Sequence, residues 1–121
     1  DLLHRVIANL VLNAVQAAGG PVNVLVTIGP ALQSDVPRGS GIESPSRLDV
    51  KDNGPGSPED IADRLFEPFV SGRPGGSGLG LAIVQRAVEA HRGLITVASA
   101  VGEGTTFTIF LPTNWSAEED E

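Results

Sequence analysis

The sequence predicts an α+β fold, a two-layer α/β sandwich in which about three helices cover one face of a mixed, mostly antiparallel sheet. Two observations support this fold class. Apolar residues recur at every third or fourth position in residues 1–18 and 81–91, which is the period of a helix packed against a core. Four segments rich in β-branched residues occur as two consecutive pairs, which indicates hairpins and therefore antiparallel strands.

The first half of the chain is expected to hold one long helix and one hairpin. The helix, residues 1–18, is apolar on nearly every side, which predicts that it is buried, and Gly19-Gly20-Pro21 ends it. Strands are expected at 22–28 and 47–51. Residues 29–46 between them are rich in Pro, Gly and Ser, which predicts a long, mobile hairpin connection.

The second half is expected to hold two helices and another hairpin. Ser57 is a candidate N-cap for a short helix that runs to about Leu65. A helix over 81–91 is predicted to end at Gly93. The residues expected to face inward from it are Ile83, Val84, Ala87 and Val88. The last strands, 94–98 and 105–111, would form a hairpin around Gly102-Glu103-Gly104.

Composition excludes several classes of function. The chain has 121 residues, enough for one domain, and we expect the domain to cover 1–112 and an acidic, disordered tail to cover 113–121. A net charge of −7 and a single lysine, Lys51, argue against nucleic acid as a partner. The absence of cysteine excludes disulfides and zinc–thiolate sites. No apolar run is long enough to span a membrane, and no signal peptide is recognisable.

Two asparagines share a face of the first expected helix, because Asn9 and Asn13 are four residues apart. Amides on a buried helix need hydrogen-bond partners, so one interpretation is that both simply satisfy nearby backbone groups. The other is that an amide oxygen is a ligand of Mg²⁺, which prefers one or two protein oxygens together with phosphates and water. The residues alone leave both open.

An aspartate followed by a glycine-rich turn, Asp52-Asn53-Gly54-Pro55-Gly56, comes directly after an expected strand. A simple turn explains the glycines but not the acidic residue at the strand end. A carboxylate accepts hydrogen bonds, so it could accept one from the exocyclic amine of adenine, whereas guanine would present an acceptor there. The turn therefore predicts a site selective for adenine.

A second glycine-rich stretch, residues 72–80, precedes the expected helix over 81–91. Backbone amides without neighbouring Cβ atoms can approach phosphate oxygens, and the helix N-terminus adds positive potential. A plain flexible loop is the alternative. The P-loop, dinucleotide-binding and nucleophile-elbow patterns all fail here. In Gly102-Glu103-Gly104-Thr105-Thr106, a threonine hydroxyl could reach a base or a water molecule, although a hairpin turn alone also explains this segment.

Taken in order, these segments resemble the catalytic domain of sensor histidine kinases. The matching boxes are Asn9-x-x-x-Asn13-Ala14, Asp52-x-Gly54-x-Gly56, Phe66-Glu67-Pro68-Phe69, Gly76-x-Gly78-Leu79-Gly80 and Gly102-x-Gly104-Thr105. The resemblance covers residues 1–112. Within the family, the sequence is most similar to sensor kinases of the nitrogen-regulator type. It implies the Bergerat-type ATP-binding fold that gyrase, the heat-shock 90 chaperone, MutL and histidine kinases share.

The resemblance also implies roles for single residues. Asn13 would bind Mg²⁺ and Asn9 would lie near the phosphates. Asp52 would bind adenine, with Thr105 near the same end of the nucleotide. The remaining expected site residues are Gly54 and Gly56 beneath the base, Arg73 at the terminal phosphate, Ser77, Gly78, Leu79 and Gly80 in the phosphate loop, and Phe66 and Phe69 at the root of the lid.

The implied reaction is transfer of the γ-phosphoryl group of Mg²⁺-ATP to a histidine on a separate dimerisation domain, which would pass it to a response regulator. Relatives that hydrolyse ATP carry a glutamate where this chain has Asn9, and an amide is a poor base, so hydrolysis should be slow. Neither His4 nor His91 resembles an acceptor. The domain itself would face the cytoplasm without contacting the membrane, although the full-length protein could be membrane-anchored.

The chain departs from the family pattern in two places. Gln16 stands where many relatives have lysine, and no strand precedes the first helix, so the sheet would lack one strand or a partner element would fill its place. These departures keep open a degenerate module in which ATP regulates binding. Two further alternatives are an ATPase of the gyrase or chaperone branch, against which Asn9 argues, and an anti-sigma-type serine kinase.

Overall fold

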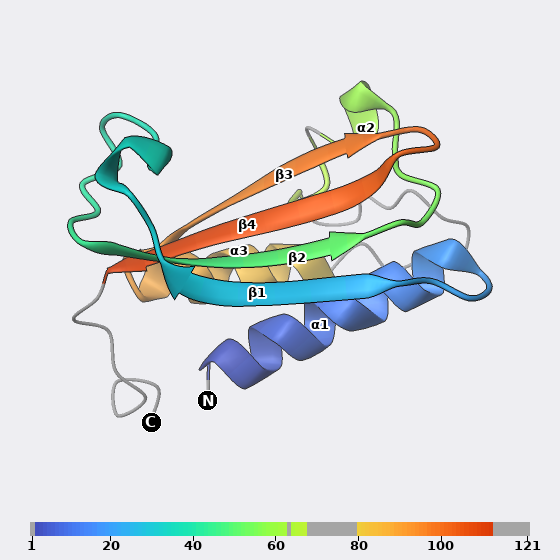
Figure 1. The fold of residues 1–121 in the computed structure, drawn as a ribbon, viewed down its shortest axis with the longest axis horizontal. Helices are drawn as coiled ribbons and strands as arrows, with labels where there is room; N and C mark the ends of the chain where they lie inside the picture. Colours follow the sequence, from blue (N-terminus) through green and yellow to red (C-terminus); the bar gives the residue numbers. More distant parts are fainter. Residues whose placement is uncertain (1, 63, 68–79, 113–121) are drawn as a thin grey trace.

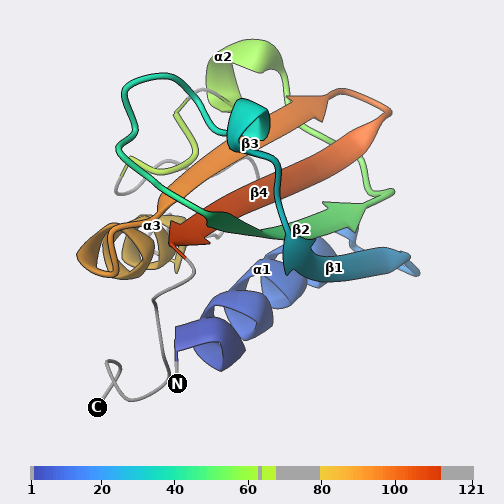
Figure 2. The same cartoon turned by 60° about the vertical axis from the view of Figure 1, so that its left-hand side comes forward.

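The structure, a computed structural model, describes residues 2–62, 64–67 and 80–112. Its centre is a four-stranded antiparallel sheet with the strand order β1-β2-β4-β3, and α1 and α3 lie together on one face (Figures 1 and 2). The predicted α+β fold is confirmed. The elements are α1 (Leu2–Ala18), β1 (Val24–Pro30), the 3₁₀ turn η1 (Gln33–Asp35), β2 (Pro45–Asp52), α2 (Glu59–Ala62), α3 (Gly80–Ala90), β3 (Leu94–Ala100) and β4 (Gly104–Pro112).

The strands match the expected ones but differ at their ends. β1 begins two residues later than predicted, and β2 begins at Pro45 because its first residues pair with β1 and with the end of β4. The short helix α2 ends at Ala62, three residues before the predicted end. In the part of the chain that the structure describes, β1 lies at one edge of the sheet. The segment 113–121, expected to be a disordered tail, lies outside the described residues.

The main core lies between the sheet and the helices. Alternate residues of each strand point toward the helices, so cross-strand partners such as Val50 and Phe107 share that face. The buried residues of this cluster come from every layer: Leu2, Val6, Leu10, Leu48, Val50, Leu65, Leu81, Val84, Val88, Ile95, Phe107, Ile109 and Leu111. The sparse aromatic content thus leaves a core built mainly of Leu, Val and Ile.

The first helix is amphipathic, which corrects the prediction that it is buried all round. One stripe packs on the sheet, through Leu2, Val6, Leu10 and Ala14. On the opposite side Leu12 and Val15 are about half exposed, at 52% and 48%. The prediction was wrong because an apolar residue on a helix is buried only where another element covers it, and composition does not show which sides are covered. Within the described residues, the two-layer fold places the sheet against one side of α1 and α3 beside it.

The second long helix packs mostly as predicted. Val84 and Val88 are buried and Ala87 contacts the same core, but Ile83 is 60% exposed, so its predicted inward position is wrong. The helix ends near Gly93, yet the left-handed residue is Arg92, with φ of 63°. The Gly93 amide donates to the Val88 carbonyl in a Schellman-like closure.

Gly93 is required for packing rather than for its φ angle. A Cβ atom there would come within 2.6 Å of a Leu111 methyl group and 2.7 Å of the Phe110 carbonyl oxygen. Arg92, by contrast, has the conformation that glycine tolerates best. The predicted helix end is therefore confirmed, and the residue in the left-handed conformation is Arg92 rather than the glycine.

Replacing Arg92 with glycine is expected to raise the free energy of unfolding by about 0.5–1 kcal/mol, because the relief of left-handed strain exceeds the added entropy of glycine in the unfolded chain. Urea denaturation measures this change. Arg92→Ala is the matched control: it also removes the guanidinium but keeps the Cβ atom, so it should not stabilise. Equal stabilisation by both variants would show that side-chain charge, not φ, is the cause.

The connection between β1 and β2 is folded against the sheet, which corrects the expectation of a loose link. Val36 and Ile42 are buried with Phe110 in a second, small cluster on the face opposite the helices. Gln33 ties the loop together, because its side-chain amide donates to the Ile42 carbonyl at 2.6 Å and accepts from the Ser44 amide at 3.2 Å. Pro, Gly and Ser dominate this segment, and nothing in the sequence indicated that its Val36 and Ile42 would pack with Phe110 on the face away from the main core.

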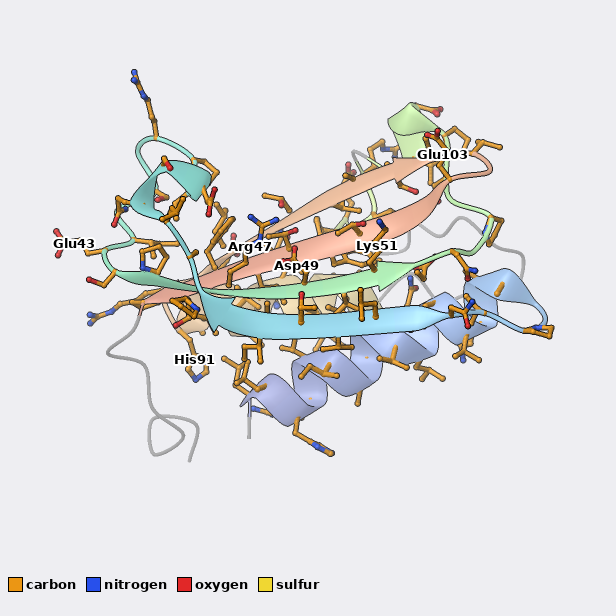
Figure 3. The ribbon with its side chains drawn as sticks, viewed as in Figure 1. Glu43, Arg47, Asp49, Lys51, His91 and Glu103 are labelled. Carbon is orange, nitrogen blue, oxygen red and sulfur yellow. The ribbon has the colours of Figure 1, made fainter. Side chains whose placement is uncertain are left out.

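A polar network continues along this open face beside the small cluster. Arg47, Asp49 and Lys51 project from β2 on the side away from the helices (Figure 3). The Asp49 carboxylate accepts from Arg47 Nε at 2.8 Å and from the Thr108 hydroxyl at 2.6 Å. Burial alone would raise the pKa of Asp49, but these two hydrogen bonds outweigh it, so the pKa lies below its ordinary value.

Acidification should therefore remove part of the stability of the fold. Because the pKa of Asp49 is lower in the folded chain than in the unfolded chain, its contribution is complete above the range in which an unfolded carboxyl group titrates. It is lost as the pH falls through the lowered value. Urea denaturation across this pH range measures the effect.

Two variants serve as comparisons for this pH dependence. Asp49→Asn should flatten the decline relative to the parent, and Thr108→Val should reduce it because one of the two hydrogen bonds is gone. If the parent and Asp49→Asn lose stability in parallel on acidification, the network does not carry the effect.

No helix in residues 2–62, 64–67 and 80–112 is long and apolar enough to cross a membrane.

Candidate functional site

The candidate site begins at the end of β2, where an acidic residue is buried. Asp52 is 8% exposed and lies on the helix-facing side of the strand, two residues after Val50. Its Oδ1 atom accepts a hydrogen bond from the Gly54 amide at 2.8 Å. A carboxylate has about four lone-pair positions, so this bond orients the side chain and leaves other positions able to accept further hydrogen bonds. The strand thus ends in a fixed hydrogen-bond acceptor.

The glycines that follow are needed because the turn touches the β3–β4 hairpin. A Cβ atom on Gly56, whose φ is 68°, would overlap the Ala100 carbonyl oxygen, and one on Gly104, whose φ is 79°, would overlap that of Asp52. The Gly102 amide donates to the Pro55 carbonyl at 2.8 Å. The two glycine-rich turns, fifty residues apart in the sequence, are therefore one packed unit.

Thr105 lies directly across from Asp52 in the β2–β4 register, and Ser99 lies across from Thr105 on the other side. The three side chains therefore form a row on the helix-facing side of the sheet. Ser99 Oγ is 2.8 Å from Thr105 Oγ1, accepts from the Ser57 amide at 2.8 Å and donates to the Gly104 carbonyl at 3.1 Å. The hydroxyl of Ser99 thus joins both turns.

The far side of the Asp52 turn is tied to the chain that follows α1. Asn53 Oδ1 accepts from the Asn23 amide at 2.8 Å, and the Asn53 amide donates to the Asn23 carbonyl at 3.2 Å. A Cβ atom on Gly54 would lie 3.9 Å from the Cβ atom of Ala18. The C-terminal end of α1 is therefore held beside the turn.

The two asparagines of α1 lie farther along the same helix. With a rise of 1.5 Å per residue, Asn13 is about 7.5 Å and Asn9 about 13.5 Å from Ala18 along the axis. Asn13 is half-buried at the boundary of the packed stripe, whereas Asn9 is exposed and donates through Nδ2 to the Arg5 carbonyl at 2.9 Å. The expectation of two buried amides is thus wrong for Asn9, because it lies beyond the edge of the packed stripe.

The donor set fits a magnesium ion shared with a nucleotide. The described residues hold no cluster of three or more His, Cys, Asp or Glu side chains suited to a metal by themselves. Mg²⁺ needs no such cluster where phosphates supply ligands, and one amide oxygen from a half-buried helix position is then sufficient. Asn13 is the described residue with that chemistry at that position.

Part of the predicted phosphate site lies outside the described residues, namely Arg73, Ser77, Gly78 and Leu79, together with Phe69. Gly80, the last residue of the expected loop, is exposed and begins α3. Phe66 contacts Phe107 edge to face, with ring centroids 6.0 Å apart, so the described part of that box packs against the core.

Sequence reasoning missed Ser99, Asn23 and Asn53 as parts of the site. Ser99 and Asn23 lie outside the glycine-rich segments, and Asn53 was counted only as a turn residue. A signal existed for Ser99, since it lies as far before the turn around Gly102 as Thr105 lies after it. His4 is exposed, and His91 Nδ1 is 2.8 Å from the Ala87 carbonyl oxygen near the C-terminus of α3.

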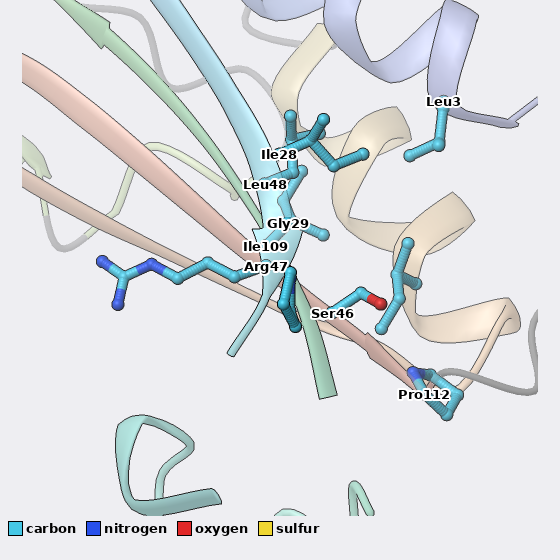
Figure 4. Close-up of a pocket in the computed structure, with 10 residues that line it drawn as sticks. Leu3, Ile28, Gly29, Ser46, Arg47, Leu48, Ile109 and Pro112 are labelled. Atoms are coloured by element: carbon cyan, nitrogen blue, oxygen red, sulfur yellow. The ribbon is translucent and has the colours of Figure 1, made fainter. Parts of the chain in front are cut away.

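An apolar pocket of about 340 Å³ opens at the other end of the sheet (Figure 4). It lies between the start of α1, at Leu3, and the ends of β1, β2 and β4, near Ile28, Ser46 and Pro112. None of the residues that line it belongs to the predicted site. The candidate site is therefore the polar end of the sheet, at Asp52, rather than this pocket.

Curated sequence relatives are sensor histidine kinases. The chain is 46% identical over 114 residues to the sensory histidine kinase/phosphatase NtrB of Rhodobacter capsulatus, a match that covers 93% of this chain and 32% of that protein. It is 38% identical over 121 residues to the sensor histidine kinase ZraS of Escherichia coli, covering all of this chain and 24% of that protein. The chain thus spans about a third or less of these relatives' length. The NtrB matches support the nitrogen-regulator type.

Solved structures agree with the sequence relatives. The crystal structure of full-length ShkA in complex with AMPPNP superposes with a TM-score of 0.71 at 34% identity, covering 92% of this chain and 21% of that one. The mycobacterial sensor histidine kinase MprB gives a TM-score of 0.71 at 30% identity, covering 92% and 72%. Residues 1–114 match the family model described as histidine kinase-, DNA gyrase B- and HSP90-like ATPase. The chain therefore belongs to that family, as its resemblance to sensor histidine kinases predicted.

Proposed function

We propose that residues 1–112 form the catalytic domain of a sensor histidine kinase, which binds Mg²⁺-ATP and donates its γ-phosphoryl group to a histidine on a separate dimerisation domain. The observation that carries this proposal is the buried Asp52 carboxylate, which ends β2 between two packed glycine turns. A fixed acceptor at the end of a strand fits the exocyclic amine of adenine and repels the 6-oxo group of guanine.

The helix α1 would then follow the nucleotide from base to phosphates. Ala18 lies at the base-binding end, and Asn13 and Asn9 follow at increasing distance along the axis. Asn13 would hold Mg²⁺, which neutralises phosphate charge when bound. One hydrogen of Asn9 Nδ2 is used by Arg5, and the second can donate to a phosphate oxygen.

The remaining phosphate contacts would come from the segment that precedes α3. We assign Arg73 to the terminal phosphate, and the backbone of Ser77, Gly78, Leu79 and Gly80 to the phosphate chain. A guanidinium and backbone amides stabilise charge that develops on the γ-phosphoryl oxygens, which is the main requirement of phosphoryl transfer. Gly80 supports this assignment, because α3 begins there and its N-terminus favours anions.

The acceptor would be a neutral imidazole nitrogen on the dimerisation domain. It attacks the γ-phosphorus in line, the bond to the β–γ bridging oxygen breaks, and ADP leaves. Asn9 stands where hydrolysing relatives carry a base, and an amide does not deprotonate water. The domain would therefore hold the γ-phosphate for a partner rather than hydrolyse it. The phosphohistidine would pass its group to a response regulator, on the cytoplasmic side of the membrane.

Isothermal titration of the chain with ATP and GTP, with and without Mg²⁺, tests this proposal together with a phosphate-release assay. We expect adenine-selective binding that is tighter with Mg²⁺, and very slow hydrolysis. Rapid release of phosphate would instead support the ATPase alternative. Failure to bind ATP under all conditions would overturn the nucleotide site.

A further inference from the structure

We propose that Ser99 is a positioning residue that sets the specificity of the base site, because it fixes the Thr105 hydroxyl as a hydrogen-bond acceptor. The inference rests on the proposed function and concerns a residue outside the five family boxes. Ser99 lies on β3, and its hydroxyl contacts three groups from both glycine turns.

A count of hydrogens and lone pairs fixes the direction of each bond. A serine hydroxyl has one hydrogen and two lone pairs. The Gly104 carbonyl can only accept, so the Ser99 hydrogen is donated there, at 3.1 Å. The Ser57 amide can only donate, so it occupies one lone pair at 2.8 Å. The second lone pair is left for Thr105 Oγ1, which at 2.8 Å must then donate its own hydrogen to Ser99.

This assignment determines what Thr105 presents to the nucleotide. Once its hydrogen is given to Ser99, the Thr105 oxygen has only lone pairs to offer. Thr105 is the cross-strand partner of Asp52 and shares its face of the sheet. Two neighbouring acceptors therefore face the base, and both select for hydrogen-bond donors such as the 6-amino group of adenine or a water molecule bound to it.

The contacts of Ser99 leave the two turns dependent on the same hydroxyl. Ser57 follows directly after Gly56, whose closest approach is to the β3–β4 hairpin, and Gly104 precedes Thr105 in the chain. Because Ser99 is half-buried, water cannot replace all three of its bonds at once. Loss of this hydroxyl therefore frees the Thr105 hydrogen as well as weakening the packing of the turns.

The test compares the affinities of the chain for ATP and inosine triphosphate, whose base carries a 6-oxo group. In Ser99→Ala, the Thr105 hydrogen is free to turn toward that oxygen. The ratio of ATP affinity to inosine triphosphate affinity should then fall by about threefold to tenfold, as expected for one hydrogen bond whose direction is reversed. The ratio is insensitive to a partial loss of folded protein, because both nucleotides are measured on the same sample.

Three further variants separate positioning from stability. Ser99→Thr keeps the hydroxyl and should restore the parent ratio. Ser46→Ala removes a serine at the other end of the same sheet and should leave the ratio unchanged. In a Thr105→Val background, Ser99→Ala should have no additional effect on the ratio, because the hydrogen it would release is absent.

The outcomes distinguish this inference from the proposed function. If the parent chain binds neither nucleotide, the proposed function fails. If the parent prefers ATP and Ser99→Ala lowers both affinities equally, the nucleotide site stands and Ser99 has only a structural role. A change of ratio in Ser99→Ala that persists in the Thr105→Val background would show that the effect does not pass through Thr105.

Discussion

Replacement of Asp52 with asparagine is expected to lower the affinity for ATP by about ten- to a hundredfold while the fold is retained, because a charged acceptor is lost. The asparagine oxygen can still accept from the Gly54 amide, as Oδ1 does in the parent. The second carboxylate oxygen is replaced by an NH₂ group, so two hydrogen-bond donors, this group and the amine of adenine, would face each other. Isothermal titration measures the loss, and thermal unfolding without nucleotide checks the fold.

Asp49 provides the matched control, since it lies three residues earlier on the same strand but faces away from the helices. Asp49→Asn removes the same charge and should leave ATP affinity unchanged. The amide of Asp52→Asn can also donate to a 6-oxo group, so the preference for ATP over inosine triphosphate should narrow. Unchanged ATP affinity in Asp52→Asn would place the adenine elsewhere.

The second large effect concerns the contact between the two glycine turns. Gly104→Ala should destabilise the chain by about 1–2 kcal/mol from left-handed strain, and by at least about 2 kcal/mol more from overlap with the Asp52 carbonyl oxygen. The overlap pushes the end of β2 away from β4, so the row formed by Asp52 and Thr105 opens. Urea denaturation and ATP titration should therefore both be affected.

Gly102→Ala isolates the two causes, because Gly102 has nearly the same φ, 80°, but open space where a Cβ atom would lie. It should cost only the strain, about 1–2 kcal/mol, and bind ATP normally once folded. If Gly102→Ala and Gly104→Ala destabilise equally, the packing of the two turns contributes nothing beyond their backbone conformation.

The sequence was most informative where local chemistry alone decides the structure. The buried end of β2 at Asp52 and the hairpin around Gly102 could be predicted, because a strand pattern followed by glycines has few interpretations. Helix burial was less predictable. Leu12 and Val15 are as apolar as Leu10, and which of them is buried depends on where the sheet lies.

Contacts between residues far apart in the sequence could not be predicted from sequence patterns. Ser99 acquires its role from Ser57, forty-two residues away, and no local pattern encodes that pairing. The sequence placed Phe110 in a strand without indicating its partners. In the structure it packs with Val36 and Ile42 of the loop between β1 and β2, in a cluster separate from the main core. Residue types predicted the elements, whereas partners that meet only in the folded chain decided the site.

The position of β4 between β2 and β3 has a consequence for hydrogen exchange. From Phe107 to Leu111 every residue of β4 is buried, with one set facing the helices and the other covered by the small cluster or the Asp49 network. The amides of β4 donate alternately to β2 and to β3, so the whole set is released only when both neighbours separate. These amides should therefore exchange through global unfolding, whereas those of the edge strand β1 should exchange through local opening. Thr105 belongs to this strand, so the proposed base site would be ordered before a nucleotide arrives, which would reduce the entropy lost on binding.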